Sequence, residues 1–235
     1  MVRSRGAAAG LTTASGCGSK LTATETAPLD ATYGQSLGRS TLTYANLVTD
    51  TFAFGADGAA ATGGGKTFDL IVTNGTASGY WTPDHSQQIY LYENGTTGVI
   101  EGRVGSGGNP DQAGAVAFTV AVASTGDVTL TQYLAVEHTP NFTNDQVSGG
   151  LTAGTLTLRA TATDKDGDAL PSDVDLGSII RFEDDGPAIN AKTDLIYSNA
   201  SNPTPGGTGV FDYSIGADAR TTFSSSNSDF SAITL

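Results

Sequence analysis

The chain has 235 residues, of which 31 are glycine, and its 24 acidic and 11 basic side chains give a formal net charge of −13. Abundant Gly, Thr and Ser with few Lys and Glu argue against a helical bundle, and the negative charge excludes nucleic acids and anionic membranes as expected partners. The single cysteine, Cys17, excludes an internal disulfide framework, and no apolar run approaches the length of a membrane span, so no membrane insertion is predicted.

The first 24 residues are predicted to be a flexible lead-in. Residues 1–5 carry two arginines, as a secretion signal would, but the apolar stretch that follows is short and rich in Ala and Gly. A signal peptide is therefore not favoured.

From Leu29 onward the sequence predicts short β-strands separated by turn residues. Apolar side chains alternate with polar, small or tyrosine side chains, and no convincing helical period interrupts them. Asn-Gly pairs at 74–75 and 94–95 predict hairpin turns. This pattern predicts an all-β fold, an Ig-like β-sandwich of antiparallel strands whose two layers bury one face of each strand. The expected strands contain the alternating segments 68–72, 89–92, 116–122, 128–130, 156–163 and 174–182.

A sequence repeat indicates a second, incomplete unit. The segment FAFGAD at 52–57 recurs as YSIGAD 161 positions later, and the Pro- and Gly-rich stretch 202–207 between the two copies has the composition of a linker. A period of this length is typical of tandem domains. The predicted organisation is a lead-in (1–24), a β-sandwich repeat domain (25–187), a linker (188–207) and the truncated start of a second repeat (208–235).

Acidic residues are concentrated near the end of the first unit. Positions 164 to 185 contain eight of the 24 acids and only two basic side chains, Lys165 and Arg181. Carboxylates this dense repel one another unless cations or hydrogen-bond donors compensate. Alternating Asp residues around a Gly place several oxygens inside one turn, which is how Ca²⁺ is held. The alternative is a solvated acidic turn, since Asp and Gly are common turn residues.

The acidic spacing does not match an EF-hand. Counting from Asp164, the sixth position is Ala169 where the EF-hand requires Gly, and the flanking segments are predicted strands. We predict instead that an Asp-rich loop between strands binds one Ca²⁺. A second ion is predicted at the exit from the domain. The Asp of a Gly-Ala-Asp-Gly turn either belongs to one of these two sites or only shapes its own turn. The corresponding residues are Asp164, Asp166 and Asp168 for the first ion, Glu183, Asp184 and Asp185 for the second, and Asp57 in the turn.

Several ordered motifs resemble a known family. Together they are similar to the repeat domain of giant RTX (repeats-in-toxin) adhesins that bacteria export by type I secretion, the family DUF5801, over about residues 29–187. The tail, residues 211–235, is similar to the start of another such repeat. The motifs are FGADG at 54–58, LYENG at 91–95, VAFTV at 116–120, GDVTLTQY at 126–133, ATDKDGD at 162–168 and FEDDGP at 182–187.

The resemblance implies a role. It implies a calcium-stabilised spacer repeat within a large secreted adhesin that acts in cell-surface or biofilm attachment. The expected location is extracellular or on the bacterial cell surface. Neighbouring repeats of the same chain are the expected partners, and other domains of the parent protein would contact surface glycans or other cells.

Two other functions are weighed against this one. A carbohydrate-binding module would use exposed aromatic rings, and the competing interpretation is that these rings pack within the sandwich. An enzyme is not predicted, because the sequence lacks the Gly-x-Ser-x-Gly and His-Glu-x-x-His motifs and contains two histidines, of which His138 beside Glu137 is the catalytic candidate. The candidate sugar-binding rings are Tyr80, Trp81, Tyr90, Tyr92 and Tyr133.

Overall fold

The computed structural model describes residues 11–13, 29–138, 150–177, 179–182, 188–192 and 211–214. These residues are almost entirely β-strands and turns. The chain divides into two compact units, the first formed by Met1–Asn141 with Val147–Glu183 and the second by Phe142–Gln146 with Asp184–Leu235. In the part of the chain that is described, no helix has the length and apolar character needed to cross a membrane.

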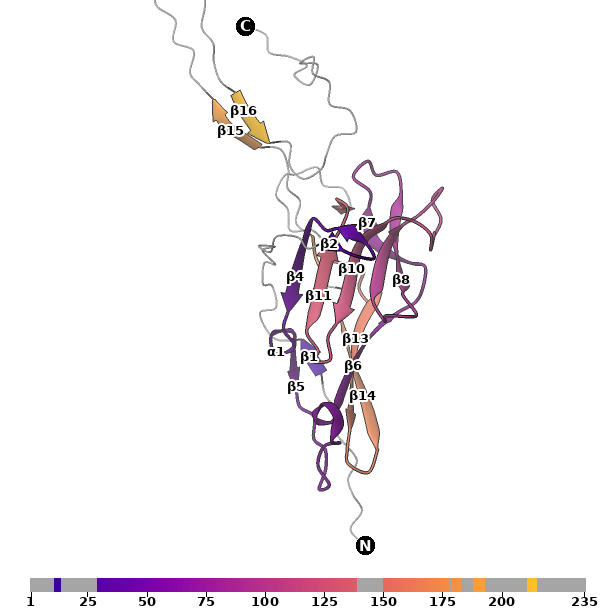
Figure 1. Ribbon diagram of the computed structural model, residues 1–235, viewed down its shortest axis with the longest axis vertical. Helices are drawn as coiled ribbons and strands as arrows, with labels where there is room; N and C mark the ends of the chain where they lie inside the picture. Colours follow the sequence, from indigo (N-terminus) through magenta and orange to yellow (C-terminus); the bar gives the residue numbers. More distant parts are fainter. Residues whose placement is uncertain are drawn as a thin grey trace, which may run out of the picture. The chain divides into compact units, whose positions relative to one another are not determined.

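The larger sheet of the first unit has seven antiparallel strands in the order β12-β7-β8-β9-β10-β11-β4 (Figure 1). Strands β7 to β11 follow one another both along the chain and across the sheet, so they form a meander. Strands β4 and β12 flank the meander. The bounds are β4 (Gly38–Leu42), β7 (Thr76–Trp81), β8 (Gln88–Glu93), β9 (Ile100–Val104), β10 (Val116–Val122), β11 (Val128–Gln132) and β12 (Glu137–His138).

The second sheet has three antiparallel strands in the order β14-β13-β6. Its strands are β6 (Lys66–Val72), β13 (Leu156–Thr163) and β14 (Ala169–Asp175). Two short antiparallel pairs complete the first unit, β2 (Leu29–Asp30) with β3 (Gly34–Gln35) and β1 (Leu11–Thr13) with β5 (Val48–Asp50). Helix α1 (Tyr44–Leu47) leads from β4 into β5, and the 3₁₀ helix η1 (Thr62–Gly65) precedes β6. Strand β1 lies within the segment predicted to be a lead-in.

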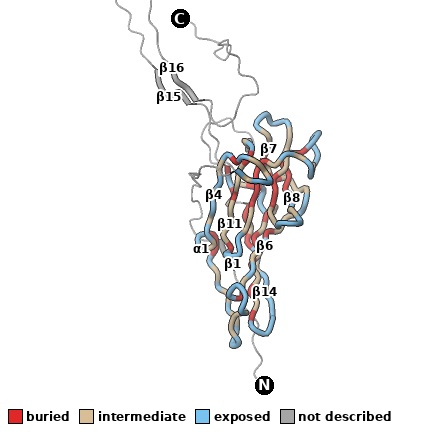
Figure 2. Tube along the Cα trace, in the orientation of Figure 1, coloured by how far each residue is buried: buried red, intermediate tan, exposed pale blue. Residues whose placement is uncertain are grey.

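The hydrophobic core lies between the two sheets. Its fully buried side chains come from both layers, and Figure 2 shows buried residues along the central strands. On β10, Phe118 lies opposite Gly102 of β9, and its ring covers the space that a side chain at Gly102 would need. The predicted all-β sandwich is confirmed by this arrangement. The core includes Leu70, Leu156 and Leu158 from the smaller sheet and Ile89, Leu91, Ile100, Phe118 and Val120 from the larger one.

The outer face of the larger sheet is also partly covered. Tyr90 and Tyr92 alternate with the core residues of β8, yet they are only 7% and 6% exposed. Loop 105–114 covers part of this face, where the Tyr90 hydroxyl donates to the Gly108 carbonyl at 3.2 Å. Tyr80 and Tyr133 are buried as well. The four tyrosines considered as sugar-binding rings are therefore packed within the domain.

Trp81 is half-buried and has one ring face occupied. Its indole stacks on the imidazole of His85, with ring centroids 4.5 Å apart. His85 in turn contacts Glu137, where Nδ1 lies 3.0 Å from Oε2. The backbone of His138, the histidine considered for catalysis, pairs with Tyr80 of β7, and its side chain is outside the described part of the structure.

The prediction of a β-hairpin at residues 74–75 is wrong. The chain does turn there, and Gly75 adopts φ +81°, but β6 pairs with β13 whereas β7 pairs with β8 and β12. The Asn-Gly pair thus carries the chain from one sheet to the other, because a tight turn does not by itself decide which strand pairs with which. The second predicted hairpin is confirmed, since β8 and β9 pair directly.

The second unit contains one described element, the antiparallel pair of β15 (Ala188–Lys192) and β16 (Phe211–Ser214). Strand β15 lies in the segment predicted to be a linker, and β16 lies in the predicted second repeat. Residues 202–207 are outside the described part.

Candidate metal centre

The acidic loop, residues 164–168, joins β13 to β14, since Thr163 and Ala169 are the nearest paired residues. The Asp164 N–H donates to the Asp168 carbonyl at 3.0 Å, and the Asp168 N–H donates to Asp164 Oδ1 at 2.9 Å. Gly167 adopts φ +97°, a left-handed conformation that costs glycine little. These contacts hold the two ends of the acidic loop together in a compact turn.

A neighbouring segment, residues 58–60, runs alongside the acidic loop. Ala59 forms a β-bridge with Asp164, and the Lys165 N–H donates to the carbonyl of Gly58 at 3.0 Å. The loop is thus fixed to a part of the chain that is distant in sequence. Asp164 is 1% exposed in this setting, although it is an acidic residue in a turn.

Three carboxylates converge in the acidic loop. One oxygen from each of Asp164, Asp166 and Asp168 lies within 4.8 Å of the other two. Asp164 is buried, whereas Asp166 and Asp168 are exposed. Oδ2 of Asp164 is buried and has no hydrogen-bond partner among the described residues. A buried carboxylate oxygen without a donor is costly, so this position fits a positively charged ligand.

The three groups also perturb one another's protonation. The pKa of Asp166 is raised chiefly because its carboxyl group, when it holds a proton, can donate that proton in a hydrogen bond to Asp164, and burial and the charges of Asp164 and Asp168 add to the rise. The pKa of Asp164 is lowered chiefly by the same side-chain interaction with Asp166 and also by backbone N–H groups of the loop, which together outweigh the opposing effect of burial. A cation bound among the three carboxylates would offset the repulsion between them.

The chemistry of the donor set indicates which cations fit. The converging atoms are all carboxylate oxygens, and the group includes neither His nor Cys. Oxygen ligands of this kind suit hard divalent cations such as Ca²⁺ or Mg²⁺, whereas Zn²⁺ is more often bound by nitrogen and sulfur. The acidic loop can therefore hold a metal ion, with the buried Asp164 oxygen and the two exposed carboxylates as ligands.

The remaining predicted ligands are placed differently. Asp57 is exposed, immediately before residues 58–60, and its carboxylate is not part of the group of three. Glu183, Asp184 and Asp185, the ligands predicted for a second ion, lie outside the described residues.

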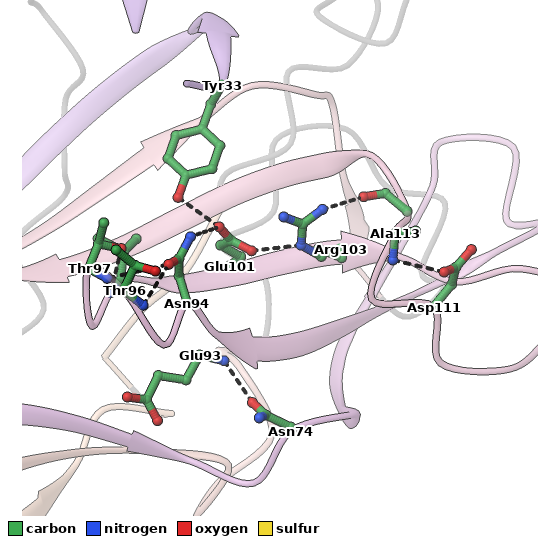
Figure 3. Close-up of polar contacts among 12 residues, drawn as sticks. Tyr33, Asn74, Glu93, Asn94, Thr96, Thr97, Glu101, Arg103, Asp111 and Ala113 are labelled. Carbon is green, nitrogen blue, oxygen red and sulfur yellow. Dashed lines mark hydrogen bonds and ion pairs between the residues drawn. The ribbon is translucent and has the colours of Figure 1, made fainter. Parts of the chain in front are cut away.

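A second polar cluster is centred on Glu101 of β9, on the outer face of the larger sheet (Figure 3). Glu101 is 3% exposed. Its Oε1 accepts hydrogen bonds from the Tyr33 hydroxyl at 2.7 Å and from Asn94 Nδ2 at 2.9 Å, and its Oε2 accepts one from Arg103 Nε at 2.7 Å. Arg103 also donates to the carbonyl of Gly114 at 2.9 Å. Both carboxylate oxygens are thus satisfied, in contrast to those of Asp164.

The electrostatics of Glu101 follow from these bonds. Burial alone would raise the pKa of Glu101, but hydrogen bonds from Asn94, Arg103 and Tyr33 and the charge of Arg103 bring it below its ordinary value. The same pairing, together with burial as the largest cause, raises the pKa of Tyr33 to about 12. The cluster joins the β2–β3 pair to the larger sheet and serves as a structural brace.

Sequence reasoning missed this cluster. The segment containing Glu101 and Arg103 alternates, but glycine stands at the middle of its apolar face, between Ile100 and Val104, so its strand signal is weak. The available signal is that Glu101 and Arg103 stand two positions apart, which places them on one face of a strand if a strand is assumed.

Comparison with known proteins identifies one family. Residues 10–177, more than half of the chain, match the family model described as a domain of unknown function, DUF5801. No curated protein and no solved structure matches the chain significantly. The matched residues include β1 and the acidic loop.

Proposed function

The chain belongs to the DUF5801 family, and we propose that it is a calcium-stabilised spacer repeat of a large secreted bacterial adhesin of the RTX type. The observation that carries the calcium part is the buried Asp164 Oδ2, which has no hydrogen-bond partner among the described residues and stands beside two exposed carboxylates. The adhesin context comes from the resemblance of the ordered motifs. The corresponding location is outside the bacterial cell.

Calcium would act by stabilising the acidic loop, to which a distant segment of the chain is attached. The acidic loop closes the β13–β14 hairpin, and residues 58–60 are hydrogen-bonded to it. An ion bound only by the folded state stabilises it by RT ln(1 + [Ca²⁺]/Kd). With a Kd of about 10⁻⁴–10⁻³ M, as in extracellular modules, millimolar Ca²⁺ would contribute about 0.4–1.4 kcal/mol. The domain would thus be more stable against unfolding in a calcium-rich medium than inside the cell.

The tandem arrangement is argued from the sequence repeat, because the FAFGAD segment at 52–57 recurs as YSIGAD 161 positions later. The backbone pairing does not add to this argument. Phe211 of β16 stands 161 positions after Asp50 of β5, but their partners Lys192 and Leu11 are 181 positions apart, so the two strand pairs are not equivalent in sequence. The acidic residues Glu183, Asp184 and Asp185 would bind a further ion.

The test is calcium titration of the full chain by calorimetry, combined with thermal unfolding in Ca²⁺ and in chelator. Binding should release or absorb heat and raise the melting temperature by a few degrees, as expected for about 1 kcal/mol in a domain of this size. The double variant Asp166→Asn, Asp168→Asn should lose both effects while remaining folded, because both side chains are exposed.

A matched control separates ligand loss from loss of charge. Glu93 is exposed and lies on β8, outside the acidic loop, so Glu93→Gln should keep the calcium response. Asp57→Asn shows whether the carboxylate of Asp57 contributes. A wild-type protein that shows neither heat of binding nor a calcium-dependent melting temperature would overturn the proposed calcium role.

A further inference from the structure

Lys66 and Asp50 form an ion pair that links strands β5 and β6 of the first unit. Lys66 is the first residue of β6 in the smaller sheet, and Asp50 is the last residue of β5, which pairs with β1. Lys66 Nζ contacts Asp50 Oδ2 directly. The two side chains are 26% and 24% exposed, so they are more enclosed than the ion pair of Arg159 with Asp173, whose side chains are 41% and 43% exposed.

Aromatic rings surround this ion pair. The Nζ atom of Lys66 lies 5.4 Å from the ring centroid of Phe52 and 5.8 Å from that of Tyr44. Phe68 packs edge-on against Tyr44, with centroids 4.8 Å apart. The amine and the carboxyl group therefore meet in a setting that is poorer in water than an ordinary surface salt bridge.

Tyr44 adds a phenol to this setting, and its hydroxyl oxygen is buried. Burial is the main reason why the pKa of Tyr44 is raised, and the charge of Asp50 and an interaction of the hydroxyl with that carboxylate raise it further, so the phenol is neutral and close to Asp50. A neutral phenol beside a carboxyl group can donate to an oxygen that carries developing negative charge.

We propose that Lys66 and Asp50 condense into an intramolecular amide, a covalent crosslink between β6 and β5. Proton transfer within the ion pair gives a neutral amine and a neutral carboxylic acid. Nζ of Lys66 then attacks Cγ of Asp50, a C–N bond forms, a C–O bond breaks, and one water molecule leaves with the proton from the amine. No oxidant or other reactant is consumed.

The competing outcome is a permanent ion pair. The aromatic rings attract the ammonium group of Lys66 and so stabilise the ion pair. Against this, the two groups contact each other directly, so one proton transfer converts the ion pair into the neutral pair that reacts. Holding the amine against an oxygen of the carboxyl group also replaces a bimolecular encounter by a positioned intramolecular one, which is among the largest rate effects known. Because condensation is needed only once in the lifetime of the protein, a slow reaction is sufficient.

The crosslink would have a structural consequence near the metal centre. Asp50 and Lys66 are 16 positions apart, and the enclosed segment contains residues 58–60, which are hydrogen-bonded to the acidic loop. A covalent closure at this point would hold that segment beside the acidic loop even when no cation is bound. The proposal does not depend on calcium binding, and its failure would leave the calcium role untouched.

The experiment is intact-mass spectrometry of the purified full chain, both fresh and after prolonged incubation in the folded state. The expected mass is lower than that of the sequence by one water molecule, and a protease digest should contain a branched peptide joining Lys66 to Asp50. Lys66→Arg keeps the positive charge but removes the nucleophile, so its mass should equal the sequence mass. Asp50→Ala should give the same result, and Lys165→Arg, a matched control, should still lose water.

Two results would overturn the proposal. The first is a wild-type mass that equals the sequence mass after incubation. The second is a loss of water that persists in Lys66→Arg, because an Asp-Gly sequence such as Asp57-Gly58 can also lose water by closing on its own backbone.

Discussion

Replacing Glu101 by Gln should cost the domain a large share of its stability. Gln has nearly the same shape and can still accept hydrogen bonds from Tyr33 and Asn94 through its oxygen. Its NH₂ group would then face Arg103 Nε, which now donates to Glu101 Oε2 at 2.7 Å. Two donors would meet, and the guanidinium would lose its counter-charge.

The expected loss of stability in Glu101→Gln follows from the burial of the Glu101–Arg103 ion pair. Removing one partner of a buried ion pair costs about 3–5 kcal/mol. The side chains of Arg103 and Glu101 are 21% and 4% exposed, so water can reach part of the guanidinium, and we expect a value near the lower limit, about 3 kcal/mol. In urea, with a slope of about 2 kcal/mol per molar, this corresponds to a midpoint lowered by roughly 1.5 M.

The assay is equilibrium urea unfolding followed by circular dichroism at neutral pH, with the slope compared between wild type and variant. Glu93→Gln on the adjacent strand is the control, and its change should stay within about 0.5 kcal/mol because the side chain is exposed. A loss of less than about 1 kcal/mol in Glu101→Gln, with an unchanged slope, would refute the view that this pair braces the domain.

Two further predictions concern neighbours of Glu101. The pKa of Tyr33 in the folded state is raised from 10.0 to about 12, so the stability that the Tyr33 hydroxyl contributes is complete below pH 10 and is lost as the pH rises to 12. The unfolding free energies of wild type and Tyr33→Phe should therefore converge between pH 10 and pH 12. A difference that stays constant over this range would contradict the hydrogen bond from Tyr33 to Glu101 as the cause. Gly102→Ala would place a Cβ 2.4 Å from the Phe118 ring and should cost about 1–3 kcal/mol in thermal unfolding, whereas Gly95→Ala, with open space around it, is the control.

The strands that the sequence predicted are those with one strictly apolar face. Leu156, Leu158, Ala160 and Ala162 of β13 are all 0% exposed, because both the period of the strand and the packing of two layers require small or aliphatic side chains there. The same alternation located β8, β10 and β11. Their pairing partners were less predictable, since register and sheet order depend on contacts between distant segments.

Only the local part of the metal centre could be predicted from the sequence. The spacing of Asp164, Asp166 and Asp168 shows that carboxylates are close along the chain. It does not show that Asp164 is buried, since that burial is accompanied by contacts with residues 58–60, about a hundred positions earlier. The pairing of Lys66 with Asp50 was equally hidden, because no local pattern relates a strand's first residue to the last residue of another strand.

Strand β14 lies at the outside of its sheet, and among the described residues it pairs only with β13. An unpaired strand edge is a template for aggregation between molecules. Here Pro171 interrupts the row of backbone donors, and Asp173, held by Arg159 through two hydrogen bonds of 2.7 Å, adds charge. For a protein proposed to present this domain many times in close succession, such an edge would keep neighbouring copies from fusing into a continuous sheet.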